Sequence, residues 1–223
     1  MSNYNIVLGD DHRIVREGLK QVLADAPDLH VVAEATTGPE VLEVLERLLG
    51  AAGAPGVASV AVVLLDIALP QRDGMDVLQD IKKRWPALPV LMLSTYPERQ
   101  YAVRCIKLGA AGYLNKAADP DAMIAAVRKV ALGGVYVSEQ TAEALASAVA
   151  KTGSLGTEAL SHREYQVFKL LTEGKSVSEI SAQLKLASNT VSTYRQRILE
   201  KTGSKNDVEL ALYAQRYAKT GVL

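Results

Sequence analysis

The chain has 223 residues, of which 48% are hydrophobic and 22% are charged, and its formal net charge at pH 7 is zero. This length suits two modest domains better than one. No apolar run approaches the roughly 18 residues of a membrane-spanning helix, and the amino terminus lacks the basic flank and apolar segment of a signal peptide. We therefore expect a cytoplasmic protein that does not enter the membrane.

The charged residues are unevenly distributed along the chain. Residues 158–223 contain ten Lys and Arg against seven Asp and Glu, whereas residues 1–138 contain 14 against 16. A surplus of three positive charges is compatible with nucleic-acid binding but does not establish it, because a solvated helix face often carries as much. The single cysteine, Cys105, excludes an internal disulfide and a cysteine-based zinc site.

The first part of the chain alternates short β-type runs with helical patterns. Runs such as Ala61–Leu65 are continuously apolar, which is typical of a parallel strand covered on both faces. The expected strands are 6–8, 30–35, 60–65, 90–93 and 112–114, and the expected helices are 14–23, 41–49, 75–81, 102–108 and 123–132. This order predicts an α/β domain with a doubly wound, parallel, five-stranded sheet, whose site lies at the carboxyl ends of the strands.

Segments rich in small residues indicate a loop and a linker. Residues 50–59 contain only Gly, Ala, Pro, Val and Ser, and we expect them to form a surface loop inserted before the third strand. Glu139–Ala150 predicts an alanine-rich helix, and 151–157 predicts a flexible tether rich in Gly, Ser and Thr. The predicted organisation is a first domain at 1–135, a linker at 136–157 and a second domain at 158–223.

The second domain shows closely spaced helix-start signals. Ser161 and Ser176 are each followed by Glu three residues later, the pattern of a capping box, and Ser188 stands as a further cap before Thr190. The short connection at 185–187 is what a helix-turn-helix requires. A last helix follows with Val208, Leu210, Leu212 and Tyr213. We predict a small all-α domain of helix-turn-helix type.

Carboxylates gather at one edge of the predicted sheet. Asp10 and Asp11 follow the first strand and Asp66 ends the third, so they converge where parallel strands end. Because crowded carboxylates repel one another, a hard divalent cation such as Mg²⁺ is expected among them. The pocket then suits phosphoryl transfer, with Asp66 as nucleophile, Lys116 reaching the phosphoryl group and Ser94 donating a hydroxyl hydrogen bond.

Each of these residues also has an ordinary structural reading. Asp11 alone is a common helix cap and Asp66 alone a common turn residue. By the same reasoning Lys116 is an exposed lysine, Ser94 a strand-end hydroxyl and Tyr113 a sheet aromatic. Their joint placement on successive strand ends favours the phosphoryl-transfer interpretation.

Four sequence stretches carry a resemblance to a known family. GDDHRIVREGL, VVLLDIALPQRDGMDVL, LMLST and GAAGYLNKAA, in this order, resemble the receiver domain of response regulators, a flavodoxin-like fold, over nearly all of residues 1–135. The resemblance implies that Asp10, Asp11, Asp66 and the carbonyl of Ala68 bind the metal and that Asp66 is phosphorylated. It further implies that Ser94 is the switch hydroxyl, Tyr113 the switch aromatic and Lys116 the phosphate-binding lysine. The loop at 50–59 and Ala117, where many receivers have proline, depart from the pattern.

The carboxyl-terminal part carries a second resemblance. Residues 158–220 resemble the LuxR-type helix-turn-helix of the NarL/FixJ family, and TVSTYRQRILEK is similar to the BvgA and EvgA type of regulator. The resemblance makes Ser188–Thr202 the recognition helix, with Val191 and Ile198 facing the core. The expected base contacts are Asn189, Ser192, Thr193 and Gln196, and the expected phosphate contacts are Arg195, Arg197, Lys201, Ser176 and Ser188. Ser192 and Tyr194 replace the common lysine and histidine, so base preference does not carry over.

The two resemblances together imply a transcriptional response regulator of a two-component system. A sensor histidine kinase would phosphorylate Asp66, and a homodimer would bind double-stranded promoter DNA and contact RNA polymerase. In the expected switch, phosphate draws Ser94 inward and Tyr113 rotates into the vacated space. No turnover on outside substrates is expected, because Ala68 stands where phosphatases of the haloacid dehalogenase type usually have a second Asp.

Two alternatives remain open from the sequence. One is a DNA-binding regulator that works without phosphorylation and keeps a vestigial receiver. The other is that residues 158–223 form a small helical domain for dimerisation or protein docking. Arg195 and Arg197 would then be solvated charges without a partner. His12, His30 and His162 show no metal-ligand spacing, so we expect no metal site besides the acidic pocket.

Overall fold

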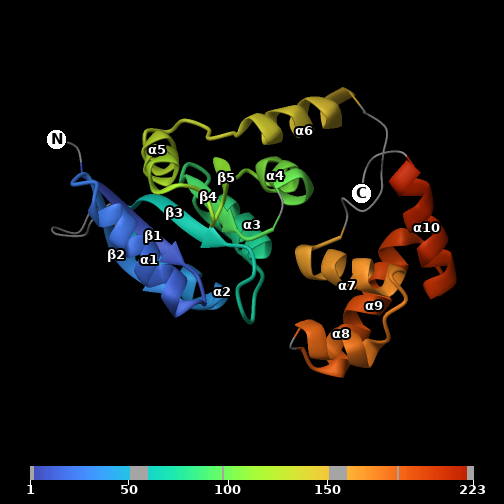
Figure 1. Ribbon diagram of the computed structural model, residues 1–223. Helices are drawn as coiled ribbons and strands as arrows, with labels where there is room; N and C mark the ends of the chain where they lie inside the picture. Colours follow the sequence, from blue (N-terminus) through green and yellow to red (C-terminus); the bar gives the residue numbers. More distant parts are fainter. Residues whose placement is uncertain (1–2, 51–59, 97, 151–159, 185, 220–223) are drawn as a thin grey trace. The chain divides into compact units, whose positions relative to one another are not determined.

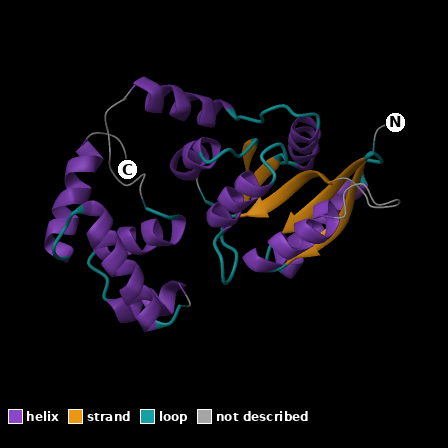
Figure 2. Cartoon of the chain, turned by 180° about the vertical axis from the view of Figure 1, so that it is seen from behind, coloured by secondary structure: helices purple, strands orange, loops and turns teal. Residues whose placement is uncertain are grey.

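The computed structural model describes residues 3–50, 60–96, 98–150, 160–184 and 186–219 (Figures 1 and 2). The chain divides into two compact units, residues 1–150 and 151–223. Over the described ranges, no helix combines the length and apolarity that crossing a bilayer would need. The predicted tether at 151–157 and all but the first residue of the predicted loop at 50–59 lie outside the described residues.

The first unit contains a parallel sheet with helices on both faces, as predicted. Its strands are β1 (Tyr4–Gly9), β2 (Leu29–Ala35), β3 (Val60–Asp66), β4 (Val90–Ser94) and β5 (Gly112–Asn115), in the order β2-β1-β3-β4-β5. Its helices are α1 (Arg13–Ala24), α2 (Gly38–Gly50), α3 (Gly74–Arg84), α4 (Glu98–Lys107), α5 (Pro120–Ala131) and α6 (Glu139–Ala150). Helices α1 and α5 cover one face, and α2, α3 and α4 cover the other.

Alternation of side chains along the strands explains why both faces of the sheet are buried and apolar. Ile6 and Leu8 of β1 pack with Leu19 and Leu23 of α1, while Val7 between them is equally buried toward the other face. Because β1 lies between β2 and β3, the chain leaves the ends of β1 and β3 in opposite directions. This switch point opens a crevice at the carboxyl ends of the two strands, and Asp10 and Asp66 lie there.

The second unit is a bundle of short helices, as predicted. These are α7 (His162–Thr172), α8 (Val177–Leu184), α9 (Ser188–Thr202) and α10 (Asp207–Lys219). The core is formed by side chains from all four helices, among them Val167, Phe168, Ile180, Val191, Ile198 and Leu210. The first unit and the second unit thus each bury a core of their own.

Two of the three predicted helix caps are confirmed and one is wrong. Ser161 and Ser176 each exchange hydrogen bonds with the glutamate three residues later. Ser188 is not the cap of α9, because the helix starts one residue earlier than the sequence pattern indicates. The carbonyl of Ala187 accepts from the amides of Thr190 and Val191, which makes Ala187 the capping residue and Ser188 the first helical one.

The turn after β3 depends on a glycine. The amide of Gly74 donates to the carbonyl of Ile67 at 2.9 Å, and a Cβ at this position would lie 1.9 Å from the carbonyl oxygen of Asp66. Since backbone atoms on both sides of this contact are fixed by the sheet and by α3, the overlap has no cheap relief.

Gly74→Ala is therefore expected to lower the free energy of unfolding by about 2–3 kcal/mol, in the upper range of overpacking costs. Gly18→Ala is the matched control, because Gly18 is exposed in α1 and a Cβ there meets nothing within 4 Å. It should raise stability by about 0.5–1 kcal/mol through helix propensity. Urea denaturation of both variants measures the difference, and equal stability of the two would contradict the steric argument.

Candidate functional site

Four polar side chains meet at the carboxyl edge of the sheet. Asp10, Asp11, His12 and Asp66 each present a potential ligand atom, and these atoms all lie within 4.8 Å of one another. Asp10 is fully buried and Asp66 is 2% exposed. The three carboxylates that the sequence predicted to converge are thus brought together by the ends of β1 and β3.

Lys116 supplies the positive charge of this cluster. Its Nζ lies 2.6 Å from Oδ2 of Asp10 and 2.8 Å from Oδ2 of Asp66, and its side chain is only 7% exposed. Burial alone would lower the pKa of Lys116, but the carboxylates of Asp66 and Asp10 outweigh it and raise the pKa above its usual value. The amide of Lys116 donates to the carbonyl of Ser94 at 2.9 Å, which fixes the residue beside the end of β4.

The electrostatics of Asp66 follow from burial. Desolvation raises the pKa of Asp66 above its usual value, and the neighbouring carboxylate of Asp10 raises it further. Lys116 and the amide of Ala68 offset part of this rise because they interact with the ionised form. An additional cation beside Asp66 would therefore stabilise its ionised form and lower the free energy of the site.

The donor set suits a hard divalent cation. The three aspartates offer oxygen ligands at the spacing that a shared ion requires, and two of them are buried where repulsion is strongest. Asp10, Asp11 and Asp66 are the residues of this pocket that can hold such an ion.

His12 is a member of the cluster that sequence reasoning missed. Its amide donates to Oδ1 of Asp10 at 2.8 Å, and its Nδ1 lies 2.6 Å from Oδ1 of Asp11. Histidine spacing along the chain carried no signal, because the neighbours of His12 are aspartates rather than other histidines. Its position directly after the Asp10–Asp11 pair was the only available sign.

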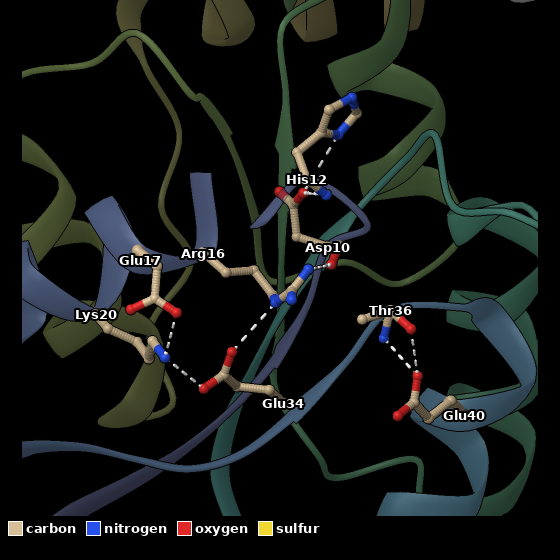
Figure 3. Close-up of polar contacts among 8 residues, drawn as sticks. All are labelled: Asp10, His12, Arg16, Glu17, Lys20, Glu34, Thr36 and Glu40. Atoms are coloured by element: carbon tan, nitrogen blue, oxygen red, sulfur yellow. Dashed lines mark hydrogen bonds and ion pairs between the residues drawn. The ribbon is translucent and has the colours of Figure 1, made fainter. Parts of the chain in front are cut away.

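A second missed group holds the Asp10 backbone in place (Figure 3). Arg16 of α1 donates through Nη1 to the carbonyl of Asp10 at 2.8 Å and through Nε to Glu34 of β2 at 3.1 Å. Lys20, one turn further along α1, lies 2.7 Å from the same glutamate. The spacing of Arg16 and Lys20 on one helix face was visible in the sequence, but their shared partner on β2 was not.

Ser94 and Tyr113 lie on neighbouring strands near the cluster. Ser94 is 1% exposed, and its Oγ accepts from the amide of Tyr96 at 3.0 Å. The hydroxyl of Tyr113 donates to the carbonyl of Tyr96 at 2.8 Å, and burial raises the pKa of this tyrosine. Tyr113 is 1% exposed, so its side chain already lies inward in the structure. In the expected switch, Tyr113 reaches this inward position only after it rotates.

The second unit presents the polar face of α9. Val191 and Ile198 are fully buried, as predicted. The opposite face of the helix is exposed, and it carries Ser188, Asn189, Ser192, Thr193, Gln196, Arg197 and Lys201. Asn189, Thr193, Tyr194 and Arg197 line an open hollow of about 360 Å³ on this helix.

Several residues predicted to contact phosphate already have partners within the chain. Arg195 pairs with Asp207 of α10, with Nε 2.8 Å from Oδ1, and Lys201 pairs with the buried Glu164 of α7 at 2.6 Å. The amide and hydroxyl of Ser176 are both bonded to Glu179, and the hydroxyl of Ser188 lies 3.1 Å from that of Ser181. The pairs made by Arg195, Lys201 and Ser188 fix α9 against its neighbours, which the sequence spacing did not indicate. The Ser176–Glu179 pair is the predicted capping box of α8.

Comparison with known proteins finds a family for each unit. Residues 6–128 match the response regulator receiver domain, and residues 158–214 match bacterial regulatory proteins of the luxR family. The chain is 39% identical over 206 residues to the transcriptional regulatory protein UhpA of Escherichia coli K12, covering 92% of this chain and 95% of the relative. It is 32% identical over 215 residues to the response regulator UvrY of the same organism, covering 96% and 94%.

Solved structures are similar over nearly the whole chain. The response regulator ChrA of a heme-sensing two-component system is 29% identical, with a TM-score of 0.51 and coverage of 98% of this chain and 99% of that one. RcsB of Salmonella enterica serovar Typhimurium, bound to the P1flhDC promoter in the presence of the phosphomimetic BeF3⁻, gives a TM-score of 0.59 at 24% identity, with coverage of 96% and 98%. This second likeness bears on the fold alone.

The fold, the acidic pocket and these matches define a response regulator with a receiver and a DNA-binding domain. The chain belongs to the NarL/FixJ family of response regulators, whose second domain is the LuxR-type helix-turn-helix. It regulates transcription in a two-component system, so a kinase and DNA are its partners. The match to the luxR family leaves no support for a mere docking domain at 158–223, and the family is one of DNA-binding regulators rather than of enzymes.

Lys116→Met tests the electrostatics of the pocket. Removing the ammonium takes away the group that stabilises the ionised form of Asp66, so its pKa, already above the usual value of about 3.9, should rise further. Carboxyl ¹³C NMR titration of the aspartates measures the shift. Lys20→Met is the control, because Lys20 pairs with Glu34 and should leave Asp66 unchanged. An unchanged or lowered Asp66 pKa in Lys116→Met would be inconsistent with the pairing.

Proposed function

We propose that a sensor histidine kinase phosphorylates this chain on Asp66 and that phosphorylation controls the binding of α9 to promoter DNA. The observation that carries the proposal is the position of Asp66, nearly buried at the end of β3, 2.8 Å from Lys116 and beside two further aspartates. A turn carboxylate without a chemical role would not need this neighbourhood, because burying it costs free energy.

The chemistry is a phosphoryl transfer to a carboxylate. An Asp66 oxygen attacks phosphorus and forms an acyl phosphate, while the bond from phosphorus to the donor nitrogen of phosphohistidine breaks and the imidazole leaves with the electron pair. Lys116, already within reach of Asp66, is placed to pair with a phosphoryl oxygen. The chain modifies itself in this step and turns over no outside substrate.

Mg²⁺ is the cofactor proposed for this pocket. Asp10, Asp11, Asp66 and the carbonyl of Ala68 would hold it, and the oxygen donors of the three aspartates support this assignment. Bound there, the ion would neutralise charge on the phosphoryl oxygens. Contacts within the chain also hold Asp10 and Asp11, because Arg16 bonds to the backbone of Asp10 and His12 bonds to both aspartates.

The switch that we propose runs through Ser94 and Tyr113. The phosphoryl group would draw the Ser94 hydroxyl toward Asp66 and favour the inward Tyr113, which the bond to the Tyr96 carbonyl stabilises. Phosphorylation then acts by holding this tyrosine where it lies in the structure, and loss of phosphate lets it leave.

DNA binding is assigned to the exposed face of α9. Asn189, Ser192, Thr193 and Gln196 remain the proposed base contacts, since all four are exposed on the first turns. Among the proposed phosphate contacts, Arg197 ranks above Arg195 and Lys201, because the latter two are paired with Asp207 and Glu164. Ser176 and Ser188 stay in the proposal as contacts at helix starts.

The assembly and the domain organisation of the chain also follow from its family. We infer a homodimer on double-stranded DNA, contact with RNA polymerase and a cytoplasmic location. The proposed domains are 1–135 and 158–223, with 136–157 as the linker. The phosphorylation-independent alternative is not favoured, since the aspartates and Lys116 form one pocket.

Phosphorylation is tested by intact-protein mass after incubation with acetyl phosphate. With Mg²⁺ the parent should gain one phosphoryl group, and without Mg²⁺ it should gain little. Asp66→Asn should gain none, because an amide is a poor nucleophile. Asp28→Asn, a carboxylate paired with Arg128 away from the pocket, is the control and should behave as the parent does. An adduct on Asp66→Asn, or none on the parent, would refute the assignment.

The ranking of the arginines is tested by the salt dependence of binding to a random-sequence DNA duplex. Arg197→Ala should lower the affinity and reduce the slope of log K against log salt by about one, as expected for a lost phosphate contact. Arg195→Ala should change the slope less, because its charge is compensated by Asp207. Fluorescence anisotropy over a range of salt concentrations gives both slopes.

Arg84→Ala is the control for this comparison, since Arg84 lies in the receiver unit and pairs with Glu46. It should match the parent. If Arg195→Ala and Arg197→Ala lose the same slope, the pairing with Asp207 does not restrict Arg195 in solution and the ranking fails.

A further inference from the structure

Helix α6 packs on the receiver through a polar anchor. It lies against α4 (Figure 1), and the anchor is the carboxylate of Glu98 at the start of α4. Oε2 of Glu98 accepts from the hydroxyl of Ser138 and from that of Thr141, the latter at 3.0 Å. Ser138 Oγ also accepts from the amide of Thr141 at 3.1 Å. One carboxylate oxygen therefore binds two hydroxyls at the first turn of α6.

This anchor is buried enough to have energetic weight. Thr141 is 1% exposed, so its hydroxyl depends on Glu98 and Ser138 for its hydrogen bonds. The buried position of a threonine on an alanine-rich helix indicates a specific docking site rather than a helix that lies loosely on the surface.

The segment that leads into α6 is attached to the edge of the sheet. The amide of Tyr136 donates to the carbonyl of Ala111 at 2.8 Å, and Tyr136 pairs with Gly112 as a single parallel bridge beside β5. A Cβ on Gly112 would lie 2.7 Å from the carbonyl oxygen of Tyr136 and 3.0 Å from its Cβ. The close approach of this segment therefore requires glycine at the start of β5.

Tyr96, just after β4, connects the anchor to the phosphoacceptor pocket. Tyr96 lies two residues after Ser94 and two before Glu98. Its amide donates to Ser94 Oγ, and its carbonyl accepts from Tyr113, whose side chain is buried. Its ring also packs on that of Tyr101 in α4, with centroids 5.1 Å apart. A change at Ser94 or Tyr113 therefore acts on Tyr96, whose ring is packed on α4, the helix that begins at Glu98.

We propose that Glu98, Ser138 and Thr141 form a latch that holds α6 on α4 when Tyr113 is inward, so that phosphorylation of Asp66 strengthens the docking of α6. The proposal rests on the proposed phosphorylation of Asp66. The inward tyrosine holds the Tyr96 carbonyl, the Tyr96 ring packs on Tyr101 of α4, and Glu98 at the start of α4 binds the first turn of α6. When Tyr113 leaves the inward position, Tyr96 keeps its hydrogen bond to Ser94 but loses the one from Tyr113, and the anchor weakens. Residues 135–150 are then the part of the receiver unit that carries the signal toward the second unit.

Amide hydrogen exchange of the full chain tests the latch. The readout is a peptide that contains amides 142–146, which are bonded within α6 starting with Ala142 to the Ser138 carbonyl. Acetyl phosphate with Mg²⁺ should slow the exchange of these amides in the parent by about threefold or more, as expected for a local opening that becomes less populated. Intact mass on the same samples gives the phosphorylated fraction.

Three variants make the test specific. Glu98→Ala should abolish the phosphorylation-dependent protection, whereas Glu98→Gln should keep part of it, because the amide oxygen still accepts from Ser138 and Thr141. Glu46→Ala removes an exposed carboxylate that pairs with Arg84 and should behave as the parent does. Circular dichroism melting of each variant verifies the fold, and the partial rescue by Gln separates a lost anchor from general destabilisation.

The outcomes distinguish the latch from the function on which it rests. A phosphoryl adduct with unchanged or faster exchange at 142–146 overturns the latch and leaves the phosphorylation of Asp66 intact. Equal protection in the parent and Glu98→Ala also overturns it. Absence of any adduct refutes the proposed function, and the latch with it. Slower exchange in the phosphorylated parent, lost in Glu98→Ala and partly kept in Glu98→Gln, supports the coupling.

Discussion

The repulsion among three clustered carboxylates is the constraint on which the receiver unit depends. Asp10 and Asp66 are nearly inaccessible to water, and Asp11 lies beside them, so one ammonium from Lys116 leaves the cluster with excess negative charge. In a receiver unit without a use for these charges, the carboxylates would be protonated or apolar side chains would stand in their place. Burial raises the pKa of Asp66, and the carboxylate of Asp10 adds to this rise, while Lys116 opposes it. The Mg²⁺ that we propose for this pocket would offset the excess negative charge.

The surrounding architecture serves to keep this unfavourable group in place. The strand order β2-β1-β3 brings the ends of β1 and β3 side by side, and Gly74 lets the loop after β3 pass against the Asp66 backbone. Arg16 reaches from α1 to the carbonyl of Asp10 and is itself held by Glu34 of β2. Holding the carboxylates this close maintains their mutual repulsion, which costs folding free energy. Stability and chemical competence therefore oppose each other at this edge of the sheet.

The sequence predicted local features well and contacts between distant elements poorly. Strand and helix periodicity placed Asp10, Asp66 and Lys116 at strand ends, and parallel topology brought them together. The position of Tyr113 relative to Tyr96 depends on rotamer and loop geometry, to which periodicity is insensitive. The partner of Arg195 is Asp207, on another helix and across a turn, and a surplus of basic residues says nothing about which are paired. The prediction of Ser188 as the cap of α9 was wrong for a similar reason. The carbonyl of Ala187 accepts the first hydrogen bonds of the helix, so α9 begins one residue before the position that the pattern predicted.

The pairing of basic residues in the second unit bears on how regulation can work. Its surplus of positive charge is small, and the charges of Arg195 and Lys201 are partly compensated by their ion pairs with Asp207 and Glu164. With these two charges compensated, one such domain offers less positive charge to phosphates, and non-specific affinity falls with each missing contact. Two domains on neighbouring half-sites add their binding free energies, so a modest gain in assembly produces a large gain in occupancy. DNA binding that depends on two domains is thus sensitive to the assembly that we propose the receiver controls, whereas a strongly basic domain would stay on DNA whatever the receiver did.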